Sequence, residues 1–104
     1  MRTTFDADAQ ISMTEFDKYE AAVCKSAEYG GRYLLIMDPS KKNMIQVRGN
    51  GILPCDEDVI TLNEGQAKMI GLTNREDSMR VGVSVAEQGQ QFVMGSSITN
   101  QGDQ

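Results

Sequence analysis

The pattern that most constrains the fold is a run of apolar residues at helical spacing near the N-terminus. These residues recur at intervals of three and four positions, on one face of an α-helix: Phe16, Tyr19, Val23 and Ala27. Ser12 and Glu15 have the spacing of a capping box at the start of such a helix. Gly30-Gly31 supplies a glycine that can end it. The sequence therefore predicts an amphipathic helix between Ser12 and Gly30.

Three strands are expected to follow. Tyr33–Met37 is a continuous apolar run of strand length, and Met44–Arg48 is a second one. Between them, 38–43 has the composition of a turn, since Pro presets φ and Asp, Ser and Asn side chains bond to nearby backbone groups. These segments predict a hairpin. Gly49-Asn50-Gly51 then predicts a turn into a third, interrupted strand within 52–60, which Pro54 would confine to an edge or a bulge.

The second half predicts a short helix and another hairpin. Thr61-Leu62-Asn63-Glu64 is a capping-box candidate for a helix over Glu64–Ile70, which would bury Ala67, Met69 and Ile70 and end at Gly71. Met79–Val85 alternates strictly, with four apolar residues on one face: Met79, Val81, Val83 and Val85. A turn at 88–90 would lead into a strand over 91–94.

These elements predict a small α+β domain. Their order is helix, three strands, helix and β-hairpin, with a mostly antiparallel sheet packed by the N-terminal helix. A chain of 104 residues forms one domain. We expect residues 1–11 to be a flexible arm or a short edge strand, 12–94 to be the domain, and 95–104 to be a disordered tail.

The excess of acidic over basic residues limits the classes of partner that the chain is expected to bind. Fifteen Asp and Glu residues against ten Lys and Arg give a net charge of −5. Nucleic acids and anionic membranes both require a basic surface, so neither is expected as a direct partner. An acidic surface instead suits a basic protein partner. There is no apolar run of about 20 residues and the N-terminus lacks the apolar core of a signal peptide, so we expect a cytoplasmic location.

Residue types needed for common catalytic and metal sites are scarce. The chain has no histidine, which excludes Ser-His-Asp and Cys-His catalysis and imidazole zinc sites. It has two cysteines, Cys24 and Cys55, expected as reduced thiols, although a bridge between them stays an alternative. No glycine-rich phosphate loop is present. We therefore expect no enzymatic activity, no metal and no cofactor.

The candidate contact residues for a basic partner are acidic. One group lies on the predicted first helix, one in the segment Pro54–Asp58, and one in the charged loop before Met79: Glu15, Asp17 and Glu20; Asp56, Glu57 and Asp58; Glu76 and Asp77. In an extended strand, Asp56 and Asp58 face one side and Glu57 faces the other, so the three do not converge on one ion. Three adjacent carboxylates also disfavour a reactive Cys55 thiolate.

Three functions follow as hypotheses. The leading one is an acidic, non-enzymatic protein that binds and inhibits or masks a basic protein, as immunity, phage anti-defence or anti-CRISPR-like proteins do. The second is a dimeric chaperone or assembly module. From Val81 to Gln104 the chain carries only two charged residues, so the 79–94 hairpin could pair with another copy or with an extended segment. The third is a carboxylate enzyme or a small-ligand protein such as a nucleotide sponge.

Two resemblances bear on these alternatives. The predicted element order and the acidic charge resemble those of type III secretion chaperones, which implies an acidic dimer that binds an extended segment of an effector. Separately, Ile60–Glu64 through Met79–Val83 resembles the opening of A-type iron–sulfur carriers. The cysteines of that family would fall in 86–92, where this chain has none, so the resemblance implies no cluster here.

Overall fold

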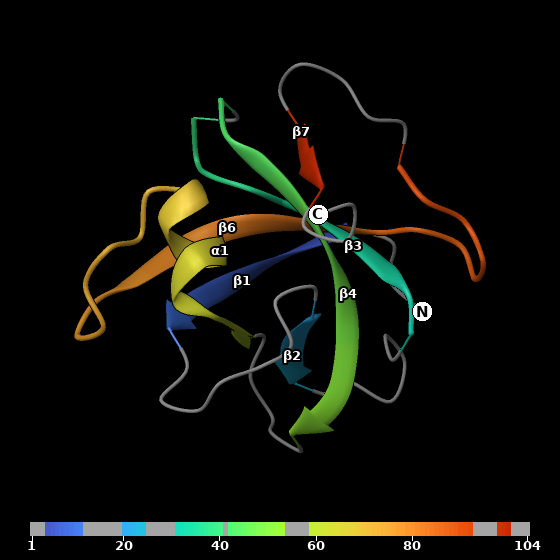
Figure 1. Ribbon diagram of the computed structural model, residues 1–104, viewed down its shortest axis with the longest axis horizontal. Helices are drawn as coiled ribbons and strands as arrows, with labels where there is room; N and C mark the ends of the chain where they lie inside the picture. Colours follow the sequence, from blue (N-terminus) through green and yellow to red (C-terminus); the bar gives the residue numbers. More distant parts are fainter. Residues whose placement is uncertain are drawn as a thin grey trace.

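The computed structural model describes residues 4–11, 20–24, 31–40, 42–53, 59–92 and 98–100, with backbone alone for 20–24, 50–53 and 98–100. Within these residues lie seven strands and one short helix (Figure 1). Their bounds are β1 Thr4–Ile11, β2 Glu20–Cys24, β3 Tyr33–Met37, β4 Met44–Leu53, β5 Val59–Leu62, α1 Glu64–Met69, β6 Ser78–Val85 and β7 Ile98–Asn100. The architecture is therefore mostly β.

All seven strands belong to one mixed sheet that closes on itself. The strand order is β2-β5-β1-β6-β3-β4-β7, and β2 also pairs with β4 in parallel. This additional pairing joins six strands into a closed barrel, because it links β2 at one end of the order to β4 near the other. β7 pairs with the first three residues of β4, while β2 pairs with its second half. Closure leaves the six barrel strands without a fully open edge.

The barrel interior is filled by residues that alternate along the strands. In β1 the even positions are exposed and the odd positions are buried: Phe5, Ala7, Ala9 and Ile11. The buried positions of β6, β3, β4 and β5 supply branched aliphatic side chains to the same core: Val81, Val83, Val85, Leu34, Ile36, Ile45, Val47, Ile60 and Leu62. Side chains in a strand alternate between the two faces, so each strand gives one set of residues to the core and the other to the outer surface.

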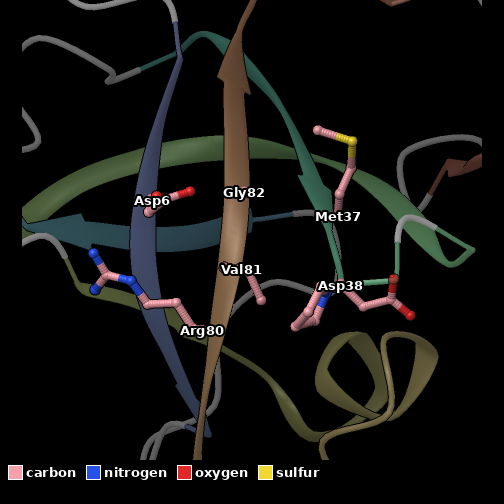
Figure 2. A pocket seen from close by; sticks show the side chains of 7 residues that line it. Asp6, Met37, Asp38, Arg80, Val81 and Gly82 are labelled. Carbon is pink, nitrogen blue, oxygen red and sulfur yellow. The ribbon is translucent and has the colours of Figure 1, made fainter.

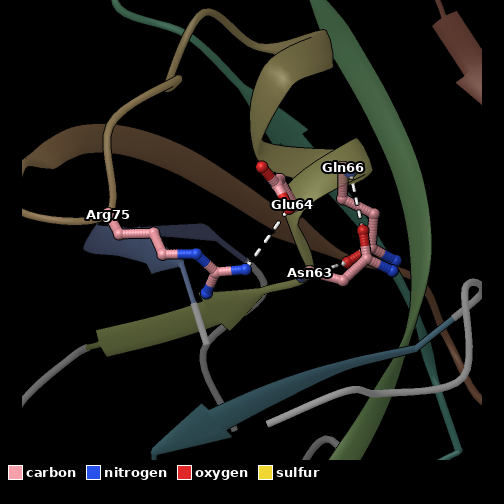
Figure 3. A network of polar contacts seen from close by, with 4 residues as sticks. All are labelled: Asn63, Glu64, Gln66 and Arg75. Carbon is pink, nitrogen blue, oxygen red and sulfur yellow. Dashed lines mark hydrogen bonds and ion pairs between the residues drawn. The ribbon is translucent and has the colours of Figure 1, made fainter. Parts of the chain in front are cut away.

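The helix predicted at Glu64–Ile70 is present as α1, with a different cap. Asn63, not Thr61, is the N-cap: its side chain accepts a hydrogen bond from the Gln66 backbone N–H at 2.8 Å, and the Gln66 side chain accepts one from the Asn63 N–H at 3.0 Å (Figure 3). Thr61 and Leu62 belong to β5 instead. Gly71 follows with φ of +94°, as a glycine at a helix end can.

The buried face of α1 also differs in one residue from the prediction. Ala67 and Ile70 are buried as expected, and together with Leu72 they join the barrel core. Met69 is 47% exposed, and Gln66 takes the buried position instead. The Gln66 Oε1 accepts a hydrogen bond from the Asn63 N–H, so burial does not leave this oxygen without a partner. A pattern based on apolarity alone cannot find a buried glutamine.

The α+β prediction is wrong because its N-terminal helix is not formed over Glu20–Cys24. These residues are β2, paired with β5 on one side and β4 on the other. Residues 12–19 and 25–30 lie outside the described residues. Helical spacing reports only which side chains could share a face, whereas closing the barrel requires a strand between β4 and β5. Tertiary pairing overrides the local preference here.

The N-terminal arm is also a strand of the barrel. Thr4–Ile11 forms β1, which lies between β5 and β6 and pairs with both. Its alternation was masked because two of the buried residues are alanines and the exposed positions include Asp6 and Asp8, which are residue types depleted in strands. At the other end, the segment predicted as a disordered tail contains β7, and the rest of 95–104 lies outside the described residues.

The first hairpin is confirmed and extends further than expected. β3 has the predicted bounds and pairs with β4 in antiparallel register. However, β4 continues through Gly49-Asn50-Gly51, where a turn was predicted. Backbone hydrogen bonds hold Gly49 in place, since its N–H donates to the Arg32 carbonyl at 2.8 Å and its carbonyl accepts from the Gly31 N–H at 2.9 Å. Glycine only permits a turn, and pairing on both edges keeps this segment extended.

The second hairpin, 79–94, is not formed. β6 has the predicted buried face, but its neighbours are β1 and β3. Gln91 and Phe92 lie outside any strand, and residues 93–97 are not described. The Phe92 N–H donates instead to the buried Gln46 side chain at 2.7 Å. Both edges of β6 are therefore used within the chain, which removes the free edge on which strand addition would depend.

The position of β1 predicts a strong effect of overpacking at Ala7. Ala7 is fully buried opposite Val81, so Ala7→Leu should lower the free energy of unfolding by about 1–3 kcal/mol. Gln10→Leu, at an exposed position of the same strand, is the matched control and should change it by less than about 0.5 kcal/mol. Urea unfolding followed by circular dichroism measures both. Equal, small effects would mean that residues 1–11 are a loose arm after all.

Candidate functional site

A pocket of about 220 Å³ lies on the outer surface of the barrel, over β1, β6 and the end of β3 (Figure 2). It is formed by residues from three segments that are distant in the sequence: Asp6; Met37, Asp38 and Pro39; Arg80, Val81 and Gly82. Charged and apolar side chains meet in this cavity, and we treat it as the candidate site.

Strand register creates the hollow at Gly82. Gly82 is paired with Asp6 on β1 and with Met37 on β3, so the three residues form a row across the sheet. The central position has no side chain, which leaves a depression between the Asp6 carboxylate and the Met37 thioether. A Cβ at position 82 would lie 3.6 Å from the Met37 methyl carbon, an ordinary contact, and Gly82 does not adopt a positive φ. The glycine is therefore not needed by the backbone, and its structural effect is the open space.

Asp38 forms one wall of the pocket and organises the loop behind it. Its Oδ1 accepts hydrogen bonds from the Ser40 hydroxyl at 2.9 Å and the Lys42 N–H at 3.1 Å, and its Oδ2 accepts one from the Asn43 amide at 2.9 Å. The Asp38 N–H donates to the Asn43 carbonyl at 3.1 Å. This is the side-chain-to-backbone bonding that the turn composition of 38–43 predicted. Figure 2 shows the carboxylate directed into the loop and away from Gly82.

These bonds fix the charge of Asp38. Desolvation by burial would raise the pKa of the carboxyl, but hydrogen bonds from the Asn43 and Ser40 side chains and from the Asn43 and Lys42 backbone outweigh it and hold the pKa below the ordinary value of 3.8. Asp38 is therefore a carboxylate at neutral pH with its lone pairs engaged by the loop. It cannot supply a proton as a general acid there.

Asp6 and Arg80 bring opposite charges to the same face. The Arg80 Nη1 lies 3.1 Å from Asp8 Oδ1, and both side chains are more than half exposed. Asp6 is exposed, and the part of the chain that the structure describes offers its carboxylate no hydrogen-bond or ion-pair partner. In Figure 2 the Asp6 carboxylate extends toward Gly82, whereas the Arg80 side chain reaches back over β1. The charge that faces the hollow is therefore negative.

The two carboxylates of the pocket differ in what they can contribute chemically. The loop around Asp38 holds the pKa of that carboxyl below its ordinary value, so Asp38 is not the proton donor of an acid–base pair near neutral pH. Within the described ranges, no group of three potential ligands could hold a metal ion. What the site offers is one carboxylate beside apolar atoms of Met37, Pro39 and Val81.

The acidic residues predicted as contacts are not brought together by the described structure. Glu76 and Asp77 are exposed in the loop before β6, where Asn74 shapes the turn by accepting from the Glu76 N–H at 3.0 Å and from the Asp77 N–H at 3.0 Å. Glu20 begins β2, opposite Arg48 of β4 in register. Glu15, Asp17 and the segment Pro54–Asp58 lie outside the described residues, as does Cys55.

The described side chains are also nearly balanced in charge, so most of the excess negative charge belongs to residues whose side chains are not described. Their acidic residues are Asp6, Asp8, Asp38, Glu64, Glu76, Asp77 and Glu87, and their basic residues are Arg32, Lys42, Arg48, Lys68, Arg75 and Arg80. Arg75 lies 3.3 Å from Glu64 across the start of α1, which neutralises a further pair (Figure 3). Most of the net charge of −5 therefore belongs to the segments around Glu15–Glu28 and Asp56–Asp58.

Sequence reasoning missed Asp6 and Gly82 as site residues. Asp6 lies in a segment assigned to an arm, and Gly82 becomes part of a pocket only because β6 separates β1 from β3. A usable signal was present in Thr4–Ile11, where every second residue is apolar. No signal in the sequence brings residues 6, 37 and 82 into one row, because strand order is a property of the tertiary fold.

No protein-family model matches the sequence, and no curated protein does. Solved structures show a similar fold. An expansin of Clavibacter michiganensis in its apo form has a TM-score of 0.60 and 14% identity to this chain, with 85% of this chain and 52% of the expansin covered. A mutant of that expansin in complex with cellohexaose has a TM-score of 0.61, at the same identity and coverage. The chain thus spans about half the length of these structures, and the likeness is one of fold. It supports the correction from α+β to a mostly β architecture.

No helix in the described ranges is long and apolar enough to cross a membrane.

Acid should weaken the fold through Asp38. Because the folded-state pKa is below 3.8, the charged form contributes stability above that pH, and the contribution is lost as the pH falls through the folded-state pKa. Asp38→Asn should therefore lower the thermal midpoint at pH 7, and its difference from wild type should shrink below pH 3.8. Asp77→Asn, in an exposed loop, is the control. A difference between Asp38→Asn and wild type that stays constant down to pH 2 would contradict this.

Proposed function

We propose that the protein is a non-enzymatic binding protein that docks onto a basic protein and inhibits or masks it. The observation that carries the proposal is the Asp6 carboxylate, which faces an apolar pocket on the barrel surface and has no partner among the described residues. An exposed carboxylate beside apolar atoms favours a cationic group over an anionic one. The net charge of −5 adds a long-range attraction for basic proteins.

The net negative charge and the Asp6 pocket would act at different stages of binding. The acidic segments accelerate encounter with a positively charged surface, and this effect weakens as salt screens it. The barrel face with the Asp6 pocket then contacts the partner at short range. A rigid sheet suits this role, because the binding residues are held by the paired strands β1 and β6 and little conformational freedom is lost on association.

The test is direct binding to defined basic ligands. The full chain is immobilised, and a lysine-rich unstructured peptide is compared by surface plasmon resonance with a glutamate-rich peptide of the same length. We expect binding of the basic peptide alone, weakening strongly between about 20 and 200 mM salt because surface charges are screened. Failure of every basic ligand to bind at low salt would reject the proposal. A partner captured from native cells would then be assayed for loss of its own activity.

Charge reversal in the segment before β5 should slow association. Replacing Asp56 and Asp58 by Lys changes the charge by four units, so the association rate with the basic peptide should fall by about tenfold at low salt and converge with wild type at 0.5 M salt. Asp56→Asn with Asp58→Asn should give an intermediate rate. If the reversed variant associates at the wild-type rate, this segment does not contribute to docking.

A carbohydrate ligand is the second candidate. One of the structures with a similar fold was solved in complex with cellohexaose, and in this chain Asp6 and Arg80 place hydrogen-bonding groups beside apolar atoms on one face. Titration of cellohexaose into the protein by calorimetry would distinguish the two candidates. Saturable heat that disappears in Asp6→Ala would favour the carbohydrate, and absence of heat would leave the basic partner.

The other two hypotheses have less support. The resemblance to type III secretion chaperones depended on an element order that the fold does not have, and the 79–94 hairpin that would form a homodimer or add a strand is not present, with both edges of β6 paired. A dimer through another surface would be detected by light scattering. A nucleotide sponge is disfavoured at this pocket because its facing carboxylate repels phosphate and about 220 Å³ is smaller than typical ligand pockets of roughly 300–1,000 Å³.

A further inference from the structure

We infer that the pocket between Asp6 and Met37 receives a single lysine or arginine side chain of the partner. This inference rests on the proposed function and specifies its central contact. The occupant is an alkyl stem with a positive charge at its end, bound with the stem in the hollow over Gly82 and the charge at the Asp6 carboxylate.

The apolar part of the pocket fits the stem. Long cationic side chains bury their methylene groups against apolar surface while the charged end stays near water or a carboxylate. Met37 is half-buried and borders the hollow on the β3 side, while Pro39 and Val81 complete the apolar lining. Met is a flexible side chain that adapts to irregular occupants. The hollow is open to solvent at Asp6, which is an exposed residue.

The electrostatics of the pocket select the sign of the occupant. Two carboxylates line it, but Asp38 is turned into its loop, so Asp6 is the one that reaches toward Gly82 (Figure 2). Arg80 would oppose a cation, yet its guanidinium lies at 3.1 Å from Asp8 and is directed over β1. Asp8 thus offsets the charge of Arg80, and the Asp6 carboxylate remains available for an incoming cation.

Gly82 sets the depth of the site. Any side chain at this position projects from the outer face, between Asp6 and Met37, into the space that the stem would occupy. The geometry tolerates a Cβ, which would lie 3.6 Å from the Met37 methyl carbon. Gly82→Val therefore fills the hollow with a residue type favoured in strands, and should leave the fold intact while it blocks the occupant.

The experiment uses peptides that differ only in one side chain. A nine-residue Gly-Ser peptide with a central lysine is titrated into the ¹⁵N-labelled full chain, and the same peptide with norleucine or glutamate serves as the comparison. Of these three peptides, we expect only the one with lysine to shift the amide signals of Met37, Val81 and Gly82. Norleucine has the same stem without the charge, so equal shifts with that peptide would overturn the inference. An arginine peptide should shift the same signals.

Variants with matched controls complete the test. Asp6→Asn and Gly82→Val should each weaken lysine-peptide binding by about threefold to tenfold. For Asp6→Asn this is the size of effect expected when one ion pair at a largely exposed site is lost. Glu87→Gln removes a carboxylate outside the pocket, and Ser84→Val adds the same side chain two residues along the same face, so both should bind as wild type does. A cooperative thermal unfolding transition in each of the four variants would show that they fold.

The outcomes separate this inference from the proposed function. If the lysine-rich peptide of the earlier test binds but Asp6→Asn and Gly82→Val bind it as wild type does, the pocket inference is wrong, and docking on a basic protein would rest on the net charge of −5 rather than on Asp6. If no basic ligand binds, both are wrong. If the lysine peptide binds wild type, binds both pocket variants more weakly and binds both control variants normally, the pocket inference and the proposed function are both supported.

Discussion

The parallel pairing of β2 with β4 is the contact on which the rest of the structure depends. It joins the two ends of a six-strand order and turns a mixed sheet into a closed barrel. Closure gives each barrel strand one inward and one outward face, so the alternating residues of β1 and β6 reach a common core. Without this pairing, β2 and the second half of β4 would expose unpaired backbone groups, which are costly to leave without partners.

The candidate site follows from that closure, because it lies on the outward face of three neighbouring strands. β6 lies between β1 and β3, and the register places Gly82 between Asp6 and Met37. The same loop that connects β3 to β4 contributes Asp38, whose hydrogen bonds to Ser40, Lys42 and Asn43 make it a structural carboxylate. One carboxylate of the pocket is thus committed to a loop and the other faces the hollow, and the proposed recognition of a cation is based on that second carboxylate.

Local elements were predictable where a single segment determines them. β3 and the first part of β4 were found from apolar runs around a turn-forming segment, and α1 was found within a residue at each end, with Gly71 as its stop. The errors share one cause. Glu20–Cys24, Thr4–Ile11 and Gly49–Gly51 all have weak or contrary local preferences, and they become strands because neighbouring strands pair with them. Local patterns carry no information about those partners.

The sequence by itself determined the charge, the absence of histidine chemistry, the alternation of Met79–Val85 and the hydrogen-bonding turn at Asp38–Asn43, because each depends on residue type or on residues close in the chain. Only the tertiary structure decided that the chain is a barrel and that Asp6, Met37 and Gly82 form one row. The physical reason is that strand pairing is set by contacts between distant segments. It therefore fixes neighbours that no local pattern specifies.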